Sequence, residues 1–250
     1  MQQGSVYNAL SGALAMHRRL STVSNNLANV STNGYKQDRT GFVGVLEQAR
    51  AEGGDKVAPG PAKTFPAIAE VETDPSTGKV RRTDRPLDFA LQGEGFFKLR
   101  TGDGGVEYTR DGRFHLNSQG QLADQEGRLV LGPDDNPVEL PSREVRANET
   151  GALFTEDGQQ VGQLGLVSSE DFSQMEKVGH NAYRGPADIM GPAQNPRVQS
   201  GAIEGSNVSP MEEMTRMVDL QRAYQSMTKA MKTIHEAYSN NGRRLAELGR

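Results

Sequence analysis

Four histidines are the first side chains to consider for metal binding or acid–base chemistry. They are His17, His115, His180 and His235, and they stand far apart in the sequence. No pair has the i, i+4 spacing with flanking carboxylates that a zinc site on a helix uses. The chain has no cysteine, which excludes disulfides, thiolate metal sites and cysteine nucleophiles. We therefore expect no metal site.

Three other patterns invite a chemical interpretation. Gly93-Glu94-Gly95 could begin a phosphate-binding loop, but Phe96 and Phe97 follow where a helix should start, so a tight turn before a buried strand is favoured. The Asx-Gly turns lack the alternating carboxylates of an EF-hand, and turn formation alone explains them. No G-x-S-x-G elbow is present. A triad assembled from distant residues stays open, but no motif points to one, and we expect neither a cofactor nor catalysis.

Composition narrows the possible partners. The chain has 250 residues, 34% of them hydrophobic, no Trp and a net charge of −4. Its lysines and arginines are scattered, with no run longer than two, so binding to nucleic acid or to an anionic membrane is poorly supported. Residues 1–11 lack the basic and apolar regions of a signal peptide, and no run approaches the length of a membrane span. On these facts alone the default is a cytoplasmic protein.

The elements that must position any site are dominated by residues 208–250. Seam positions recur there at alternating gaps of three and four, and only Asn241 among them is polar; the apolar ones are Met217, Leu220, Tyr224, Met227, Met231, Ile234, Tyr238, Leu245 and Leu248. This heptad stripe predicts a helix of roughly 38 residues. Ser209, Pro210 and Glu212 match the N-cap, first position and third position of its start. A helix this long with one apolar stripe needs a partner, and its length argues against an ordinary core helix.

The other segments are predicted from weaker patterns. A less regular amphipathic stripe predicts a helix over about residues 4–32, ending at Gly34. Strand-like runs separated by Asx-Gly and Gly-rich turns favour an antiparallel sandwich or barrel. They are residues 87–91, 95–99, 106–109, 113–116, 121–123, 128–131, 152–155, 159–167, 176–178, 181–184 and 198–203.

The predicted fold is therefore α+β. Residues 1–34 form the N-terminal helix, 35–70 an extended connector, 71–196 an antiparallel all-β domain, and 197–250 a connector strand with the long helix. We expect the terminal helices to pair as a coiled-coil layer, with the β domain inserted between them.

Four motifs in order resemble those of the rod and hook proteins of the bacterial flagellum. Residues 24–36 read SNNLANVSTNGYK, residues 87–97 LDFALQGEGFF, and residues 108–114 YTRDGRF. Residues 199–208 read QSGAIEGSNV, followed by Met214, Met217 and QRAY at 221–224. Distal-rod members of the family typically carry a G-x-x-x-G-x-G-V stretch after the first helix. Residues 57–64 read VAPGPAKT here, which favours the proximal-rod members.

The resemblance implies a structural subunit that polymerises through its ends. The implied assembly interface comprises Asn25, Asn26, Leu27, Asn29, Gly34, Tyr35, Gly201, Glu204, Ser206, Asn207, Val208, Met217, Leu220, Tyr224, Met227, Met231, Ile234 and Tyr238. Within it, Leu27 and the seam of the long helix would supply apolar contacts. Asn25, Asn26 and Asn29 would satisfy backbone groups where the first helix ends.

Partners and compartment also follow from the resemblance. The implied partners are copies of the chain, other rod proteins and the flagellar type III export apparatus, with no nucleic acid and no direct membrane insertion. The implied location is the periplasmic rod of the basal body, reached without a cleaved signal peptide. Two alternatives remain: a cytoplasmic coiled-coil adaptor with a β-type interaction domain, and a β-sandwich enzyme acting on cell-wall glycan. The enzyme would need paired carboxylates, and no such pair stands out.

Overall fold

The computed structural model describes residues 2–47 and 63–248, and it gives the side-chain surroundings of residues 11–41, 71–233 and 236. The chain divides into two compact units. A helical unit contains residues 1–27, 38–72 and 210–250, and a β unit contains residues 28–37 and 73–209. The chain therefore crosses from one unit to the other several times.

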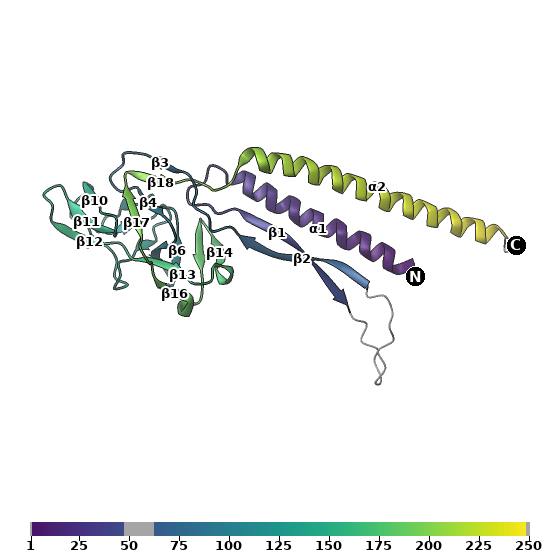
Figure 1. Ribbon diagram of the computed structural model, residues 1–250, viewed down its shortest axis with the longest axis horizontal. Coiled ribbons are helices and arrows are strands. Elements are labelled where there is room, and N and C mark those ends of the chain that lie inside the picture. Colours follow the sequence, from purple (N-terminus) through teal and green to yellow (C-terminus); the bar gives the residue numbers. More distant parts are fainter. Residues whose placement is uncertain (1, 48–62, 249–250) are drawn as a thin grey trace, which may run out of the picture. The chain divides into compact units, whose positions relative to one another are not determined.

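Two helices form most of the helical unit. Helix α1 (Gln2–Ala28) and helix α2 (Pro210–Leu248) run antiparallel and side by side (Figure 1). The 39-residue α2 begins at Pro210, as its capping pattern predicts. Helix α1 ends at Ala28 rather than near residue 32, because Asn29 and Thr32 bond each other through backbone and side chains in a local turn.

A two-stranded sheet completes the helical unit. Strand β1 (Asp38–Glu47) pairs with strand β2 (Lys63–Thr73), so the segment predicted as an extended connector contains regular structure at both of its ends. Its middle, residues 48–62, lies outside the described residues.

The β unit is built of short strands, and each of its pairings that is described is antiparallel. The strands are β3 (Val80–Arg82), β4 (Phe89–Gln92), β5 (Phe96–Arg100), β6 (Val106–Thr109), β7 (His115–Leu116), β8 (Leu122–Ala123), β9 (Leu129–Val130), β10 (Val145–Ala147), β11 (Ala152–Thr155), β12 (Gln160–Gln163), β13 (Leu166–Ser169), β14 (Glu176–Gly179), β15 (Ala182–Arg184), β16 (Met190–Pro192), β17 (Arg197–Ser200) and β18 (Ala202–Glu204). Two 3-10 turns, η1 (Phe172–Gln174) and η2 (Ala187–Ile189), connect some of them. The predicted α+β class with an antiparallel β region is confirmed.

Strand order brings distant segments together. The largest sheet runs β14-β15-β6-β5-β9-β8-β7, with β13 also pairing β5 and β16. Strands β10, β11 and β12 form a second sheet, while β17 pairs β4 and β18 pairs β3. The last two pairings matter most for the site, because they seat the chain that leads into α2 against the first strands of the β unit.

Hydrophobic residues of alternating strand positions fill the core of the β unit. Phe89, Phe97, Leu99, Leu122 and Leu153 are fully buried in one cluster. A second cluster gathers Phe96, Tyr108, Met175 and Tyr183. Burial of each such side chain stabilises the fold by about 1.5–3 kcal/mol.

Glycines decide where three predicted elements turn or divide. Gly93 and Gly95 have φ of +87° and +137° ahead of buried β5, which confirms the predicted turn. The predicted strand 159–167 is divided into β12 and β13 near Gly165, where a Cβ would lie 2.6 Å from the Gly132 carbonyl oxygen. The predicted strand 198–203 is divided at Gly201, with φ of +70°. Neither described helix has the length and apolar run needed to cross a bilayer.

Candidate functional site

The segment that follows α1 and the segment that precedes α2 lie side by side in the β unit. Residues 33–37 and 204–208, which we term the junction, are joined by backbone bonds. The Gly34 N–H donates to the Glu204 carbonyl over 2.9 Å, and the Asn207 N–H donates to the Tyr35 carbonyl over 3.3 Å. The junction contains six of the interface residues predicted from the family motifs, and a seventh, Gly201, lies just before it in the sequence.

A buried ion cluster holds the two segments of the junction to the β unit. Glu204 accepts from Lys36 Nζ at 2.7 Å and from the Gly78 N–H at 2.8 Å through one oxygen. Its other oxygen accepts from Arg110 at 3.3 Å. The side chains of Glu204, Lys36 and Arg110 are 0%, 1% and 3% exposed. Two cations therefore share one carboxylate away from water, and Lys36 also donates to the Ser76 carbonyl at 2.7 Å.

Burial is the dominant electrostatic influence on both cations. It lowers the pKa of Lys36, while the charge of Glu204 opposes that effect and the charge of Arg110 adds to it. Burial likewise lowers the pKa of Arg110, again opposed by Glu204. Because a buried charge is costly unless paired, Glu204 is the group on which the stability of this cluster depends.

Asn207 joins its own segment to two others through one side chain. Its oxygen accepts from the Gln37 N–H at 2.7 Å, and its amide donates to the carbonyls of Asp74 and Ser76, each at 3.1 Å. Nearby, Ser206 Oγ accepts from the Val208 N–H at 3.2 Å, and Val208 is buried. An Asn can donate and accept at once, which explains why this residue type suits a crossing of several backbones.

Gly34 is required by close packing as well as by conformation. Its φ is +70°, and a Cβ there would lie 2.6 Å from backbone atoms of Arg110 and Asp111. Any side chain would therefore push the junction away from the turn after β6. Gly201 also has φ of +70°; its N–H donates to Asp88 and its carbonyl accepts from Thr83 and Asp84.

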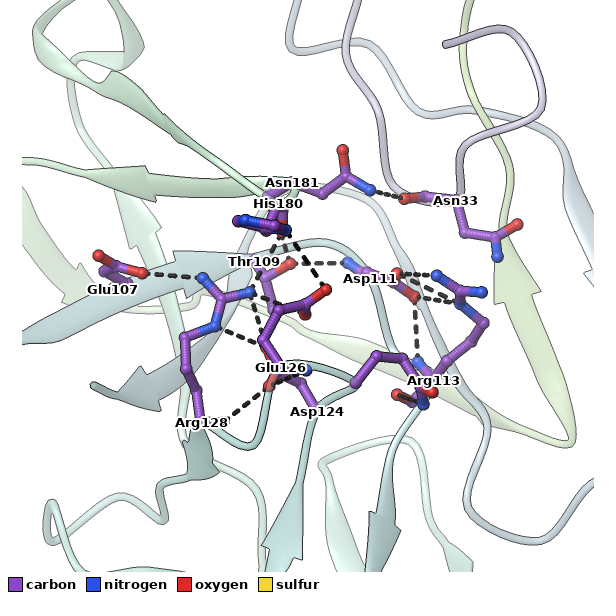
Figure 2. Close-up of polar contacts among 11 residues, drawn as sticks. Asn33, Glu107, Thr109, Asp111, Arg113, Asp124, Glu126, Arg128, His180 and Asn181 are labelled. Atoms are coloured by element: carbon purple, nitrogen blue, oxygen red, sulfur yellow. Dashed lines mark hydrogen bonds and ion pairs between the residues drawn. The ribbon is translucent and has the colours of Figure 1, made fainter. Parts of the chain in front are cut away.

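The hairpin of β14 and β15 contacts the first segment of the junction, residues 33–37. Lys177 Nζ donates to the Lys36 carbonyl at 2.6 Å and lies 4.5 Å from the centre of the buried Tyr35 ring. At the tip of the hairpin, the Asn181 amide donates to the Asn33 carbonyl at 2.9 Å, and Figure 2 shows this contact. His180 and Asn181 both have positive φ, which matches the two-residue turns that favour Asn.

A polar network holds this hairpin tip against the largest sheet (Figure 2). Thr109 donates to the Asn181 carbonyl at 2.8 Å, and Arg128 donates to the His180 carbonyl at 3.1 Å. Arg128 also contacts Glu107 and Asp124 at 2.8 and 2.7 Å. The nearest partners of the junction are thereby fixed to β6 and to the loop before β9.

In the helical unit, Asn26 and Glu213 form a polar contact between the two helices. The Asn26 amide donates to Glu213 at 3.3 Å and to the Asp38 carbonyl at 2.8 Å, and its oxygen accepts from the Asp38 N–H at 3.0 Å. Asn26 and Glu213 are 1% and 0% exposed. Asn26 thus satisfies backbone groups of β1.

The other predicted interface residues of the helices differ in burial. Leu27, Asn29, Met217, Leu220, Tyr224, Met227 and Met231 are partly buried, and Asn25 is exposed. A Cβ added to Gly12 would lie 2.4 Å from Met227 Cε. Helices α1 and α2 therefore approach each other closely at these two residues. The side chains of Ile234 and Tyr238 lie outside the described part of the structure.

Several residues of the site were not predicted. Lys36 stands inside the first motif and Arg110 inside the third, but neither pattern indicates that they share Glu204. Lys177 and Asn181 carry no signal in the sequence beyond turn propensity, and Glu213 carries none beyond its place beside Met214 in the last motif. Among the described residues, no three His, Asp or Glu side chains are grouped so that they could hold a metal ion. The arrangement is suited to holding chain segments in fixed positions.

Three family models match this chain. The model described as "Flagella basal body rod protein" matches residues 6–36, the "Flagellar hook protein FlgE/F/G D1 domain" matches residues 90–181, and the "Flagellar basal body rod FlgEFG protein C-terminal" matches residues 199–240. The first and last of these matches contain most of the junction.

Relatives are similar over nearly the whole chain. The flagellar basal-body rod protein FlgF of Caulobacter vibrioides is 32% identical over 98% of this chain and 98% of its own length. FlgG of Bacillus subtilis is 31% identical, covering 93% of this chain and 95% of its own length. FlgF of Mesorhizobium japonicum is 32% identical over 92% of each chain.

Proposed function

The chain belongs to the flagellar basal-body rod protein family, and from this we propose that it is a structural subunit of the proximal rod. Rod proteins assemble with other rod proteins, so the chain functions as one part of a larger shaft. In our proposal its terminal helices pair as a coiled coil and form an inner layer with those of neighbouring subunits. The shaft passes torque from the motor to the hook.

The junction is the observation that carries this proposal. A shaft subunit must resist being pulled or twisted at the points where its helices leave the β unit. Here both exits are tied to each other and to the β unit by buried ion pairs, by Asn207 and by the β14–β15 hairpin. Apart from Arg110 Nε, which has no hydrogen-bond partner among the described residues, the buried side-chain groups of this network are bonded, and such a network rigidifies the structure around it. A purely local cap on each helix would not need these long-range contacts.

Export and location are part of the same proposal. We infer that the subunit leaves the cytoplasm through the flagellar type III apparatus, keeps its N-terminal residues and assembles in the periplasm. Mass spectrometry of the N-terminal peptide from purified basal bodies tests this. A peptide that retains residues 2–16 is the expected result, and one that begins after an internal cleavage would contradict it.

A distal-rod role is the second candidate. Relatives named FlgF and FlgG have nearly the same percentage identity to this chain, so identity does not separate the two roles. The absence of the glycine pattern at residues 57–64 supports the proximal assignment. Gold-labelled antibodies against the β unit, applied to purified basal bodies, separate the two. Label at the inner-membrane end of the rod supports the proximal rod, whereas label near the outer end supports the distal rod.

The primary test is deletion of the gene followed by electron microscopy of basal bodies. We expect non-motile cells whose basal bodies lack a complete rod and hook, with motility restored by the wild-type gene. Intact flagella on swimming cells would overturn the proposal in favour of a coiled-coil adaptor.

A substitution tests the role of the helices more sharply. Met227→Asp places a charge at the close approach of α1 and α2, so we expect a folded β unit but no rod assembly and no motility. Gln225→Asp is the matched control, because Gln225 is exposed on α2. Replacing Gln by Asp lowers helix propensity about as much as replacing Met by Asp. Motile Met227→Asp cells would contradict this assignment of the seam.

A further inference from the structure

A pocket in the β unit adjoins the buried ion cluster. It has a volume of about 380 Å³, and Arg110 of the cluster is part of its lining. The rings of Phe96 and Phe172 also line it, and they stack with their centroids 5.7 Å apart. The volume falls in the range of sites that take small molecules. We term this cavity the Arg110 pocket.

The ion cluster beside the Arg110 pocket carries an excess of positive charge. Lys36 and Arg110 both pair with Glu204, so two buried cations share one buried carboxylate. The carboxylates of Asp74 and Glu94 have smaller effects on these cations than Glu204 has. Because a buried charge is costly unless it is paired, one further anion next to Arg110 would be stabilising.

One donor of Arg110 lacks an acceptor. The terminal nitrogens of its guanidinium donate to Glu204 at 3.3 Å and to the Gly93 carbonyl at 2.8 Å. Its Nε is buried and has no hydrogen-bond partner in the part of the chain that the structure describes. A buried donor without a partner is costly, and more so on a charged group. The guanidinium that lines the pocket therefore has room for one more acceptor.

Hydroxyl groups supply further donors in the Arg110 pocket. Ser76 Oγ accepts from the Asn207 amide at 3.1 Å, which leaves its own proton to donate. The hydroxyls of Thr77 and Ser168 also line the pocket and bond no group among the described residues. Neutral donors of this kind bind an anion without adding charge. The lining thus combines one cation with three hydroxyl protons.

The acidic residues of the lining limit the charge of the anion. Glu94 and Glu170 both line the pocket and are exposed, and they repel an anion of high charge, such as a phosphate. A carboxylate carries one charge, which matches the excess of the ion cluster. The stacked rings of Phe96 and Phe172 offer an apolar wall for the hydrocarbon part of such a ligand.

We propose that the Arg110 pocket binds a carboxylate group. Its oxygens accept from Arg110 and from the hydroxyls of Thr77 and Ser168, and its hydrocarbon part packs against the aromatic wall. The group belongs either to a free monocarboxylic acid or to an Asp or Glu side chain of a neighbouring protein. This site goes beyond the proposed function and does not depend on it, because the pocket lies within the β unit of one chain.

Saturation-transfer NMR of the full chain tests the site with sodium butyrate as the probe. We expect a signal that saturates with a Kd of about 1–10 mM, since a ligand of this size makes few contacts. Butyramide has the same shape without the charge and should give no saturable signal. Absence of saturable butyrate binding, or equal binding of butyramide, would overturn the inference.

Two variants of equal charge locate the binding. Thr77→Glu places a carboxylate at the pocket from an exposed position, so the chain should fold, and the Kd for butyrate should rise about tenfold or more. Ser142→Glu is the control, because Ser142 is exposed in the same unit and lies outside the pocket; its Kd should equal that of the wild type. Near-UV circular dichroism checks the fold of both. Equal Kd values for the two variants would contradict the assignment.

Photo-crosslinking separates the two sources of the carboxylate. Benzoylphenylalanine takes the place of Glu94 at the pocket, and purified basal bodies are illuminated. An adduct to a peptide that contains Asp or Glu in another subunit identifies a neighbouring side chain. Absence of any protein adduct, with butyrate binding intact, identifies a free acid. An adduct to a peptide without an acidic residue would overturn the inference. Loss of the inference leaves the proposed function standing, whereas absence of the chain from basal bodies would refute that function alone.

Discussion

Glu204 Oε1 lies 2.7 Å from Lys36 Nζ, and both side chains are withdrawn from water. The two residues are 168 positions apart in the sequence; one follows α1 and the other precedes α2. Arg110 shares the same carboxylate, so Glu204 is the counterion of two buried cations. The pairing joins the two chain exits of the β unit by charge as well as by backbone bonds.

Loss of the Glu204 charge should cost more stability than loss of either cation. We expect Glu204→Gln to lower the free energy of unfolding by about 3–5 kcal/mol, because it leaves two buried cations unpaired. Lys36→Met should cost only about 1–2 kcal/mol, because Glu204 keeps Arg110 and the Gly78 N–H. Urea unfolding of the full chain, followed by near-UV circular dichroism of the buried tyrosines, measures both. The reverse order would show that Glu204 is not the required counterion.

Lys36 should also leave a signature in the pH dependence of stability. Burial lowers its pKa in the folded state below the usual 10.5, so the unfolded chain binds this proton more tightly. Stability from this group is therefore present above 10.5 and lost as the pH falls through the lowered value. The free energy of unfolding of the wild type, relative to that of Lys36→Met, should rise with pH toward 10.5. A difference that stays constant or falls would contradict the shift.

Gly34 should tolerate no side chain. Gly34→Ala combines a left-handed backbone with a clash against backbone atoms of Arg110 and Asp111, so we expect a loss of about 2–4 kcal/mol. Gly127→Ala isolates the first effect, because Gly127 has φ of +82° but open space around its Cβ, and should cost about 1 kcal/mol. Urea unfolding compares the two variants. Equal losses would mean that close packing at Gly34 is not a separate constraint.

Asn26 should be important for the helical unit. Asn26→Ala leaves the Asp38 N–H and carbonyl without their side-chain partner, and we expect a cost of about 1–3 kcal/mol. Ser24→Ala, two residues away and exposed, gains similar helix propensity and should be nearly neutral. Amide hydrogen exchange of α1 and β1 provides the readout. Unchanged exchange rates in Asn26→Ala would show that the contact of Asn26 with the Asp38 backbone does not stabilise the helical unit.

Local pattern identified the elements whose signals are short-range. The heptad and the Ser209-Pro210 start predicted α2 closely, and strands β6 and β11 lie where alternation and turn residues place them. The motifs at both ends identified the family, which the comparisons confirm. Periodicity failed at residues 38–47 and 63–73, because a two-stranded sheet depends on pairing between segments as much as on propensity.

The role of the motif residues was decided only by the tertiary structure. The sequence alone determined a long seamed helix, an antiparallel β region and a list of residues at the ends, all of which rest on neighbours within a few positions. It could not determine that Glu204 meets Lys36 and Arg110, that Asn207 joins segments 131–170 residues away, or that Met214 remains exposed. These contacts and exposures depend on which distant segments of the chain lie close together, and only the folded structure determines that.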